Sequence, residues 1–382
     1  MSGTLSPSLA ADIATRVYDI SKPANLKGAF STEFRNYFKV TNSEIKGVSG
    51  GLVNQILNRS SGFAFTAVGT TPKFKKHHII GIRGTKFNSP ADWLTNGNVG
   101  VTVGPKNLAV HAGFNKTFNS LKPSLNRYIN EHSPRCLHIV GHSLGGAIAE
   151  LTAIWASNHG ITSKLYTFGA PRVVLRDSVH RAALNIEHYR VTHGGDPVPC
   201  IPVWPFTHTV AEYQTAMNSG TFFNLGAHSM DEATPGYINT VAGYRDYKSM
   251  GSKINTAKYK HTILQYAQRH QASFSHRWQQ IITDALVTIL KTTGQYAFLT
   301  GQAAAGVGLS FYDIMARCLS ESILQSPVIA EELKGLLGHI LVFVGKGTRT
   351  VTEMSIKFIR WVLGLMINTL YMKAKQAIEF VS

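Results

Sequence analysis

Between about residues 60 and 240, short apolar runs alternate with stretches whose apolar positions recur at helical spacing. The short runs predict strands at Gly62–Val68, His78–Ile82, Cys136–Val140, Lys164–Phe168 and Glu187–Thr192. Residues 146–159 instead carry apolar side chains at intervals of three and four, which predicts a helix that stops at Gly160. Strands that alternate with helices in this way are typical of an open α/β sheet.

The pattern differs on both sides of this region. Residues 1–60 predict a mostly helical entry, with helical spacing over Ser8–Ile20. After about residue 240, helical periodicity dominates Lys258–Lys291 and Ser310–Lys375. We therefore expect an N-terminal helical segment (1–60), an α/β core (61–240) and a helix-rich C-terminal region (241–382).

Two uncharged stretches of the C-terminal region raise the question of a membrane span. Trp361–Met372 is very apolar, but its 12 residues are too few to cross a bilayer. Thr292–Tyr312 is uncharged for 21 residues, yet it contains Thr, Gln and several Gly. That polarity favours a packed helical subdomain, and a membrane span is the alternative.

A Gly-x-Ser-x-Gly pattern, Gly141 to Gly145, lies between the predicted strand Cys136–Val140 and the helix that follows. In this context the serine occupies a sharp strand-to-helix turn that lifts its hydroxyl above the sheet. The turn also aims the helix N-terminus, with its N–H groups and positive dipole end, at a reacting carbonyl. Ser143 is therefore the candidate nucleophile of an acyl-transfer reaction.

Five blocks of sequence between about residues 60 and 240 resemble the class 3 lipases, the fungal-lipase-like branch of the α/β-hydrolases. They occur in family order and cover roughly half of the chain. The blocks are Ile79–Thr85 with Asp92, Trp93 and Asn96, Val110–Phe114, Ile139–Gly146, Tyr166–Val173, and Arg190–Val191 followed by Asp196–Pro199. The resemblance implies an α/β-hydrolase fold, an open and mostly parallel sheet flanked by helices, with the C-terminal helices as an addition.

The resemblance also implies the partners of Ser143. Asp196, ahead of Pro197, corresponds to the acid that orients a histidine, and its chain position fits the order Ser, Asp, His. Two of the 16 histidines follow Asp196 within the matching region. His228, which precedes Tyr237, fits the catalytic base, and His208 is the alternative.

An oxyanion hole requires two donors preset toward the developing negative charge. The backbone N–H of Leu144, the residue after the nucleophile, is one candidate. By resemblance, Thr85 supplies the second through its N–H and hydroxyl. The stretch from Phe87 to Val101 is rich in Gly and Asn, and it does not identify a lid.

Charge narrows the choice of partners. The 382 residues carry a formal net charge of +17, spread along the chain, which predicts attraction to polyanions. No arginine-rich arm, zinc-finger spacing or aromatic RNA-binding signature accompanies it. We therefore expect an anionic membrane interface with a lipid substrate, and no nucleic acid.

The number of cysteines and the first residues of the chain indicate the compartment in which the protein is made. Three cysteines argue against a disulfide framework and suit synthesis in the cytosol. The first 20 residues show no Sec signal peptide, so we expect cytoplasmic synthesis. Class 3 lipase-like toxins delivered by type VI secretion are similar in layout, which suggests signal-less export, action at a target membrane and an immunity or regulatory protein as partner.

Three functions are compatible with these features. The first is a serine lipase acting on membrane phospholipids as a phospholipase A, with an antibacterial effector role. The second is a neutral triacylglycerol lipase or soluble carboxylesterase, and the third is a non-catalytic binding protein on a hydrolase fold. No cofactor or catalytic metal is expected, because the sequence has no His-Glu-x-x-His or Cys-x-x-Cys pairing and a serine mechanism needs none.

Overall fold

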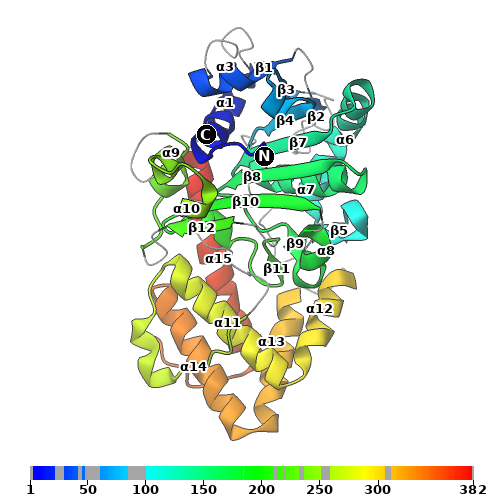
Figure 1. The fold of residues 1–382 in the computed structure, drawn as a ribbon. Helices are drawn as coiled ribbons and strands as arrows, with labels where there is room; N and C mark the ends of the chain where they lie inside the picture. The colour runs from blue at the N-terminus through cyan, green and yellow to red at the C-terminus, as the bar shows by residue number, and fades with distance from the viewer. Residues whose placement is uncertain are drawn as a thin grey trace.

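A central sheet of eight strands organises the protein, here seen in a computed structural model (Figure 1). The structure describes residues 3–21, 30–41, 45–47, 61–84, 100–183, 185–209, 213–217, 221–231, 236–250, 259–305 and 311–380. The strand order is β1-β3-β4-β7-β8-β10-β12, with β2 paired to β3. The strands are β1 (Phe38–Val40), β2 (Ile45–Gly47), β3 (Ser61–Gly69), β4 (His77–Ile82), β7 (Cys136–His142), β8 (Thr162–Phe168), β10 (Ile186–His193) and β12 (Tyr213–Met217).

The five strands from β4 to β12 are parallel, whereas β1, β2 and β4 all pair antiparallel with β3. Every residue of β7 is buried, as expected for a strand at the centre of a parallel sheet with both faces covered. The predicted open α/β sheet is thus confirmed, and all five predicted strands are present.

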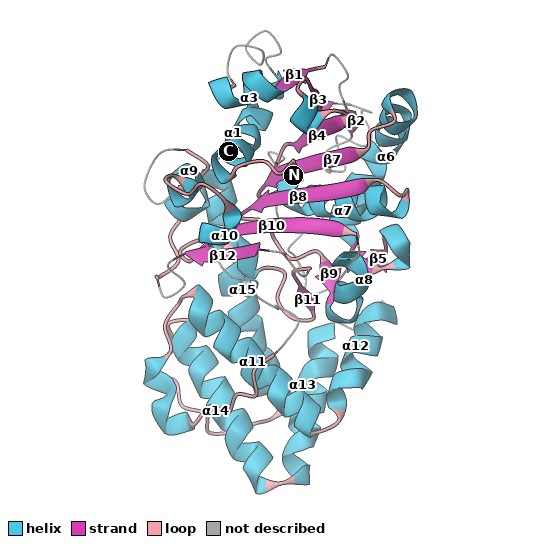
Figure 2. Cartoon of the chain, viewed as in Figure 1, coloured by secondary structure: helices cyan, strands magenta, loops and turns pink. Residues whose placement is uncertain are grey.

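Helices cover both faces of the sheet (Figure 2). Helix α1 (Pro7–Arg16) belongs to the hydrophobic cluster on one face, together with Tyr166 of β8 and Tyr237. Helices α6 (Ala112–His132) and α7 (Leu144–Asn158) belong to the cluster on the other face. Short helices complete the α/β part: α3 (Thr32–Tyr37), α8 (Val179–Ala183), α9 (Tyr237–Val241) and α10 (Tyr247–Met250).

A small antiparallel sheet lies beside the main one, with the order β11-β9-β6-β5. Its strands are β5 (Val101–Val103), β6 (Ala109–His111), β9 (Val174–Leu175) and β11 (Phe206–Thr207). It contacts α6 through β5 and β6, and it contacts α12 (Gln295–Ala305) through β5. It therefore joins the main sheet's helical layer to the C-terminal helices.

The chain beyond residue 259 is helical, apart from its connecting loops. Its helices are α11 (His276–Thr292), α12 (Gln295–Ala305), α13 (Phe311–Ser322), α14 (Pro327–Phe343) and α15 (Ile356–Phe380). Helices α11 to α14 lie below the sheet in Figure 1, while α15 extends from them toward the chain termini. The hydrophobic cluster of α7 continues into these helices without a break.

The first half of the predicted helix Lys258–Lys291 is wrong. Residues 259–275 form a loop that contains a short 3₁₀ helix, Tyr266–Gln271, and α11 begins only after Ser275. The Ser275 hydroxyl accepts a hydrogen bond from the backbone N–H of Trp278 and so caps the helix there. The periodic pattern upstream of this cap comes from loop side chains that pack on α14.

None of the described helices is long and apolar enough to cross a bilayer. Within Thr292–Tyr312, the 11-residue helix α12 lies between the end of α11 and the start of α13. The division of the chain at residues 60 and 240 stays a prediction.

Candidate active site

Ser143 occupies a strained turn between β7 and α7. Its backbone has φ 56° and ψ −132°, a region that non-glycine residues rarely adopt. Its N–H donates to the carbonyl of Phe168 on the neighbouring strand, at 3.0 Å. A Cβ atom at Gly145 would lie 2.4 Å from the carbonyl oxygen of Ile82, so only glycine lets α7 start this close to β4.

Three side chains form one hydrogen-bonded line at this turn. His228 Nε2 lies 2.8 Å from Ser143 Oγ, and His228 Nδ1 lies 2.8 Å from Asp196 Oδ2. Because a carboxylate only accepts, Nδ1 carries the imidazole proton and donates it to Asp196. Nε2 then presents its lone pair to the serine hydroxyl, which is the protonation state that a general base requires.

Asp196 is oriented by further donors. The Val198 N–H donates to Oδ1 at 2.8 Å, and the Tyr237 hydroxyl donates to Oδ2 at 2.7 Å. Burial, and then the Asp196 charge, raise the pKa of Tyr237 well above its usual value, so this phenol remains a donor. A Cβ atom at Gly169, whose φ is +55°, would lie 2.7 Å from Asp196 Oδ2. This close approach explains why the block Tyr166–Val173 has a glycine at this position.

His142, next to the nucleophile, braces the backbone of His228. Its Nε2 donates to the carbonyl oxygen of His228 at 2.8 Å, and its Nδ1 accepts from the Tyr18 hydroxyl at 2.8 Å. Burial, followed by the charge of a protonated His228, lowers the pKa of His142 well below its usual value. The neutral ring can therefore donate and accept at once. Sequence analysis missed this role, and Tyr18, 124 residues away, carries no motif.

The remaining sequence candidates have different positions. His208, the alternative base, donates from Nε2 to the Pro199 carbonyl at 2.9 Å, and it is His228 that contacts Ser143. Leu144 is the first residue of α7, so its N–H has no acceptor within the helix and lies directly after the nucleophile. Thr85 lies outside the described residues, as do Asp92 and Trp93.

The C-terminal helices contact the segments that hold the acid and the base. The chain ahead of His228 forms an isolated β-bridge, Phe222 with Ser275, and Phe223 N–H donates to the Phe274 carbonyl at 3.2 Å. Helix α15 contacts both the turn Gly226–His228 and the turn Val198–Cys200.

Arg172, which lies in the block Tyr166–Val173, makes a second link to the C-terminal helices. Its guanidinium donates to Gln279 Oε1 of α11 at 2.9 Å, and its backbone N–H donates to the Ile201 carbonyl at 2.8 Å. Both side chains are buried. The added helices are thus connected to the chain on either side of the acid.

Ser143 is 4% exposed, and Asp196 and His228 are fully buried. In this dry setting each hydrogen bond of the line is stronger than it would be in water. A hydroxyl, a neutral imidazole that accepts from it and a carboxylate that holds the imidazole make up the parts needed for nucleophilic attack on an acyl carbon.

The family model "Lipase (class 3)" matches residues 79–206. The secreted mono- and diacylglycerol lipase 1 of Fusarium solani is 30% identical over 171 residues, which cover 42% of this chain and 50% of that protein. Toxin TseL of Vibrio cholerae is 41% identical over 98 residues, 25% of this chain and 15% of the toxin. The chain thus matches half or less of the length of these relatives. Among solved structures, the Lip2 lipase of Yarrowia lipolytica aligns at 22% identity with a TM-score of 0.40, over 56% of this chain and 78% of that one.

Proposed function

Because the chain belongs to the class 3 lipase family, we propose that it is a serine lipase that hydrolyses acyl esters of lipids. The observation that carries the proposal is the line of two 2.8 Å contacts from Ser143 through His228 to Asp196. The family match covers residues 79–206, and the hydrogen-bonded line adds His228, which lies outside that match.

In the first half of the reaction, Ser143 Oγ attacks the ester carbonyl while His228 Nε2 takes its proton. Asp196 stabilises the imidazolium that forms. The carbonyl oxygen becomes an oxyanion, to which the Leu144 N–H donates. When this intermediate collapses, the ester C–O bond breaks, His228 returns the proton to the departing alcohol, and the acyl group stays on Ser143.

In the second half, water attacks the acyl-enzyme. His228 Nε2 takes a proton from the water as its oxygen bonds the acyl carbon. The bond from that carbon to Ser143 Oγ then breaks, the proton passes to Oγ, and the fatty acid leaves. The strained backbone of Ser143 and the brace from His142 keep the serine and imidazole aligned throughout both halves.

For the substrate we favour membrane phospholipids. The formal charge of +17 attracts the enzyme to anionic lipid, whereas a neutral glyceride surface offers no such attraction. The similarity to a protein named as a toxin supports an antibacterial effector that is exported and acts at a target membrane. An immunity or regulatory protein would be its partner.

A neutral glyceride lipase is the second candidate function. The Fusarium solani relative, named a mono- and diacylglycerol lipase, favours it because that match covers more of this chain than the toxin match does. A non-catalytic binding protein is the third possibility, and it makes no use of the aligned Ser143 and His228.

Vesicles that contain both an anionic phospholipid and diacylglycerol distinguish these functions. Under our proposal, wild-type protein releases fatty acid and lysophospholipid, and Ser143→Ala releases neither. Glycerol and monoacylglycerol without lysophospholipid would favour the second candidate. If wild-type protein released no lipid product and Ser143→Ala kept the antibacterial effect, the non-catalytic binding protein would be favoured.

A further inference from the structure

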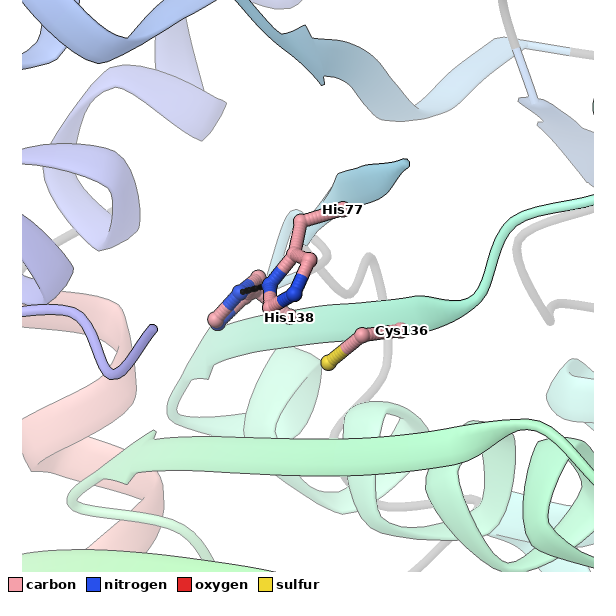
Figure 3. Close-up of side chains that lie close together, drawn as sticks. All are labelled: His77, Cys136 and His138. Carbon is pink, nitrogen blue, oxygen red and sulfur yellow. Dashed lines mark hydrogen bonds between the residues drawn. The ribbon is translucent and has the colours of Figure 1, made fainter. Parts of the chain in front are cut away.

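Three potential metal ligands gather at the start of β7, at the opposite end of that strand from Ser143. They are His77 of β4 with Cys136 and His138 of β7 (Figure 3). Their Nδ1 or Nε2 and Sγ atoms all lie within 4.8 Å of one another. The rest of β7, about 20 Å at the usual rise of a strand, separates Cys136 from the nucleophile. The proposed hydrolysis therefore does not use this cluster.

The sheet register is what brings the three together. Cys136 and His138 are two residues apart on one strand, so their side chains leave the same face. His77 is the direct neighbour of Cys136 in the parallel ladder between β4 and β7, and it leaves that face as well. His77 Nδ1 and His138 Nε2 lie 2.9 Å apart and share one proton.

We propose that Cys136, His77 and His138 form a zinc site that stabilises the fold. Imidazole nitrogen and cysteine sulfur are the ligands that Zn²⁺ prefers in proteins. Two nitrogens on one tetrahedral zinc lie about 3.3 Å apart, so the histidine pair needs to open by only a few tenths of an ångström. The sulfur must approach to about 3.6 Å from each nitrogen, which takes a small rotation of the Cys136 side chain.

The surroundings supply two further properties of a metal site. His138 Nδ1 lies 3.1 Å from the hydroxyl of Tyr166, which accepts from the Leu5 N–H, so the His138 ring is held by its outer nitrogen. Cys136 and His138 are buried, while His77 is partly exposed and gives the ion a path from solvent. When zinc binds, the thiol proton of Cys136 passes to solvent, and the proton between the two rings moves to His138 Nδ1, so that each histidine binds zinc as a neutral imidazole.

The positive charge of Lys164 opposes the binding of zinc. Lys164 is the neighbour of His138 in the ladder between β7 and β8, and its ammonium lies in the same buried region. That charge is partly offset, since Nζ lies 3.0 Å from Glu187 Oε2 and donates to Thr4 Oγ1 at 3.0 Å. The remaining repulsion keeps the affinity modest, and Lys164→Met should tighten zinc binding by about tenfold or more.

The test uses full-length protein freed of metal by a chelator and titrated with Zn²⁺ against a chromogenic competitor. We expect one site per chain, weakened about 100-fold or more in His77→Ala and Cys136→Ser. Cys318→Ser is the matched control, because Cys318 is also a buried free cysteine and no histidine accompanies it in a ligand cluster among the described residues. It should bind zinc as wild type does.

Cobalt reports the ligands directly. Co²⁺ bound at this site should give a thiolate-to-metal charge-transfer band that is absent in Cys136→Ser, and Zn²⁺ should raise the melting temperature of wild type but not of His77→Ala. Because His77 is partly exposed, this variant should fold and retain wild-type ester hydrolysis. Zinc binding that is unchanged in Cys136→Ser, or cobalt binding without a thiolate band, would place the ion on other histidines and overturn the proposal.

Discussion

Two donors meet on a single oxygen of Asp196, and one of them comes from outside the Ser–His–Asp line. The His228 Nδ1–H and the Tyr237 hydroxyl share Oδ2, while the Val198 N–H holds Oδ1. A fully buried carboxylate needs such donors to replace its lost hydration. Tyr237 is therefore a positioning residue, because it fixes the rotamer of the carboxylate that in turn fixes the base.

Tyr237→Phe should lower kcat with little change in KM. The variant keeps the ring and removes one hydrogen bond to a charged group, which contributes about 1.5–3 kcal/mol and corresponds to roughly a 10- to 100-fold loss of rate. The loss should also move the acidic limb of the pH–rate profile, since the carboxylate that supports the imidazolium is less well held. Steady-state kinetics on a soluble ester across pH measure both effects.

Tyr247→Phe is the control for that variant. Tyr247 is buried on the same face of the sheet, and among the described residues its hydroxyl has no hydrogen-bond partner. It should therefore keep wild-type kcat and pH profile. Equal losses in the two variants would mean that Tyr237 acts only through core packing.

At this scale the sequence indicated the residues that carry motifs. Ser143 and Asp196 lie in sequence blocks that resemble the lipase family. Gly145 and Gly169 lie in such blocks as well, and the structure leaves no room for a Cβ atom at either position. The hydrogen bond by which His142 holds the backbone of His228 could not be predicted from the sequence. It joins a side chain to a backbone carbonyl 86 residues away, and no local pattern encodes such a contact.

Among the elements, the link between the C-terminal helices and the loop of His228 has the clearest functional consequence. The Phe274 ring lies 4.8 Å from the Phe223 ring and 5.0 Å from the Phe343 ring of α14. Asn224 N–H then donates to the Gly195 carbonyl at 2.8 Å, next to the acid. The loop of His228 is thus held between the C-terminal helices and the turn of Asp196.

Phe274→Ala should reduce kcat for soluble esters by about tenfold, because a loosened loop holds His228 less well against Ser143. Phe358→Ala is the matched control. Phe358 of α15, like Phe274 in the loop ahead of α11, is a partly buried phenylalanine, and it contacts Trp361. It should lose comparable stability in urea denaturation and keep its activity, whereas parallel losses of activity would contradict a role of the helices in positioning the base.

Element prediction succeeded where one periodicity dominated. The buried run of β7 and the helical spacing of α7 gave both elements within about two residues of their observed starts. It failed over residues 259–275, where apolar side chains pack against α14 from a loop and imitate helical spacing. The small sheet escaped prediction because β9 and β11, with two residues each, are too short to show alternation.

For the molecule as a whole, a charge of +17 predicts salt-sensitive attachment to anionic lipid. Binding to vesicles with an anionic phospholipid should weaken steeply as NaCl rises from about 0.05 to 0.5 M, as the Debye length falls below about 10 Å. Hydrolysis of a soluble short-chain ester should change little over this range. Vesicle co-sedimentation in parallel with ester kinetics measures the two, and salt-independent binding would remove the electrostatic argument for phospholipid.

Buried histidines predict acid lability. Burial lowers the pKa of His111 to about 4, and it lowers those of His138, His142, His188 and His208 well below the usual value. Each group is protonated in the unfolded chain below about pH 6.5 but stays neutral in the folded one. The stability that depends on these neutral histidines is therefore fully present above about pH 6.5 and is lost as the pH falls. For His111 alone, the free energy of unfolding decreases by about 3 kcal/mol by pH 4.

The free energy of unfolding in urea should consequently fall between pH 6.5 and 4. His111→Phe should have a shallower pH dependence, since the new ring joins its aromatic neighbours Phe114 and Phe206 without a titratable group. A wild-type free energy that stays constant from pH 7 to pH 4.5 would show that these histidines are not buried as neutral groups.

The proposed hydrolysis depends most directly on Ser143 as the nucleophile, and a covalent label tests that role. A long-chain phosphonate ester should add one phosphonyl group per chain, mapped by mass spectrometry to Ser143, with complete loss of ester hydrolysis. His228→Asn should be labelled far more slowly, because Nε2 no longer accepts the serine proton. Labelling at another residue, or ester hydrolysis that persists in Ser143→Ala, would contradict the account.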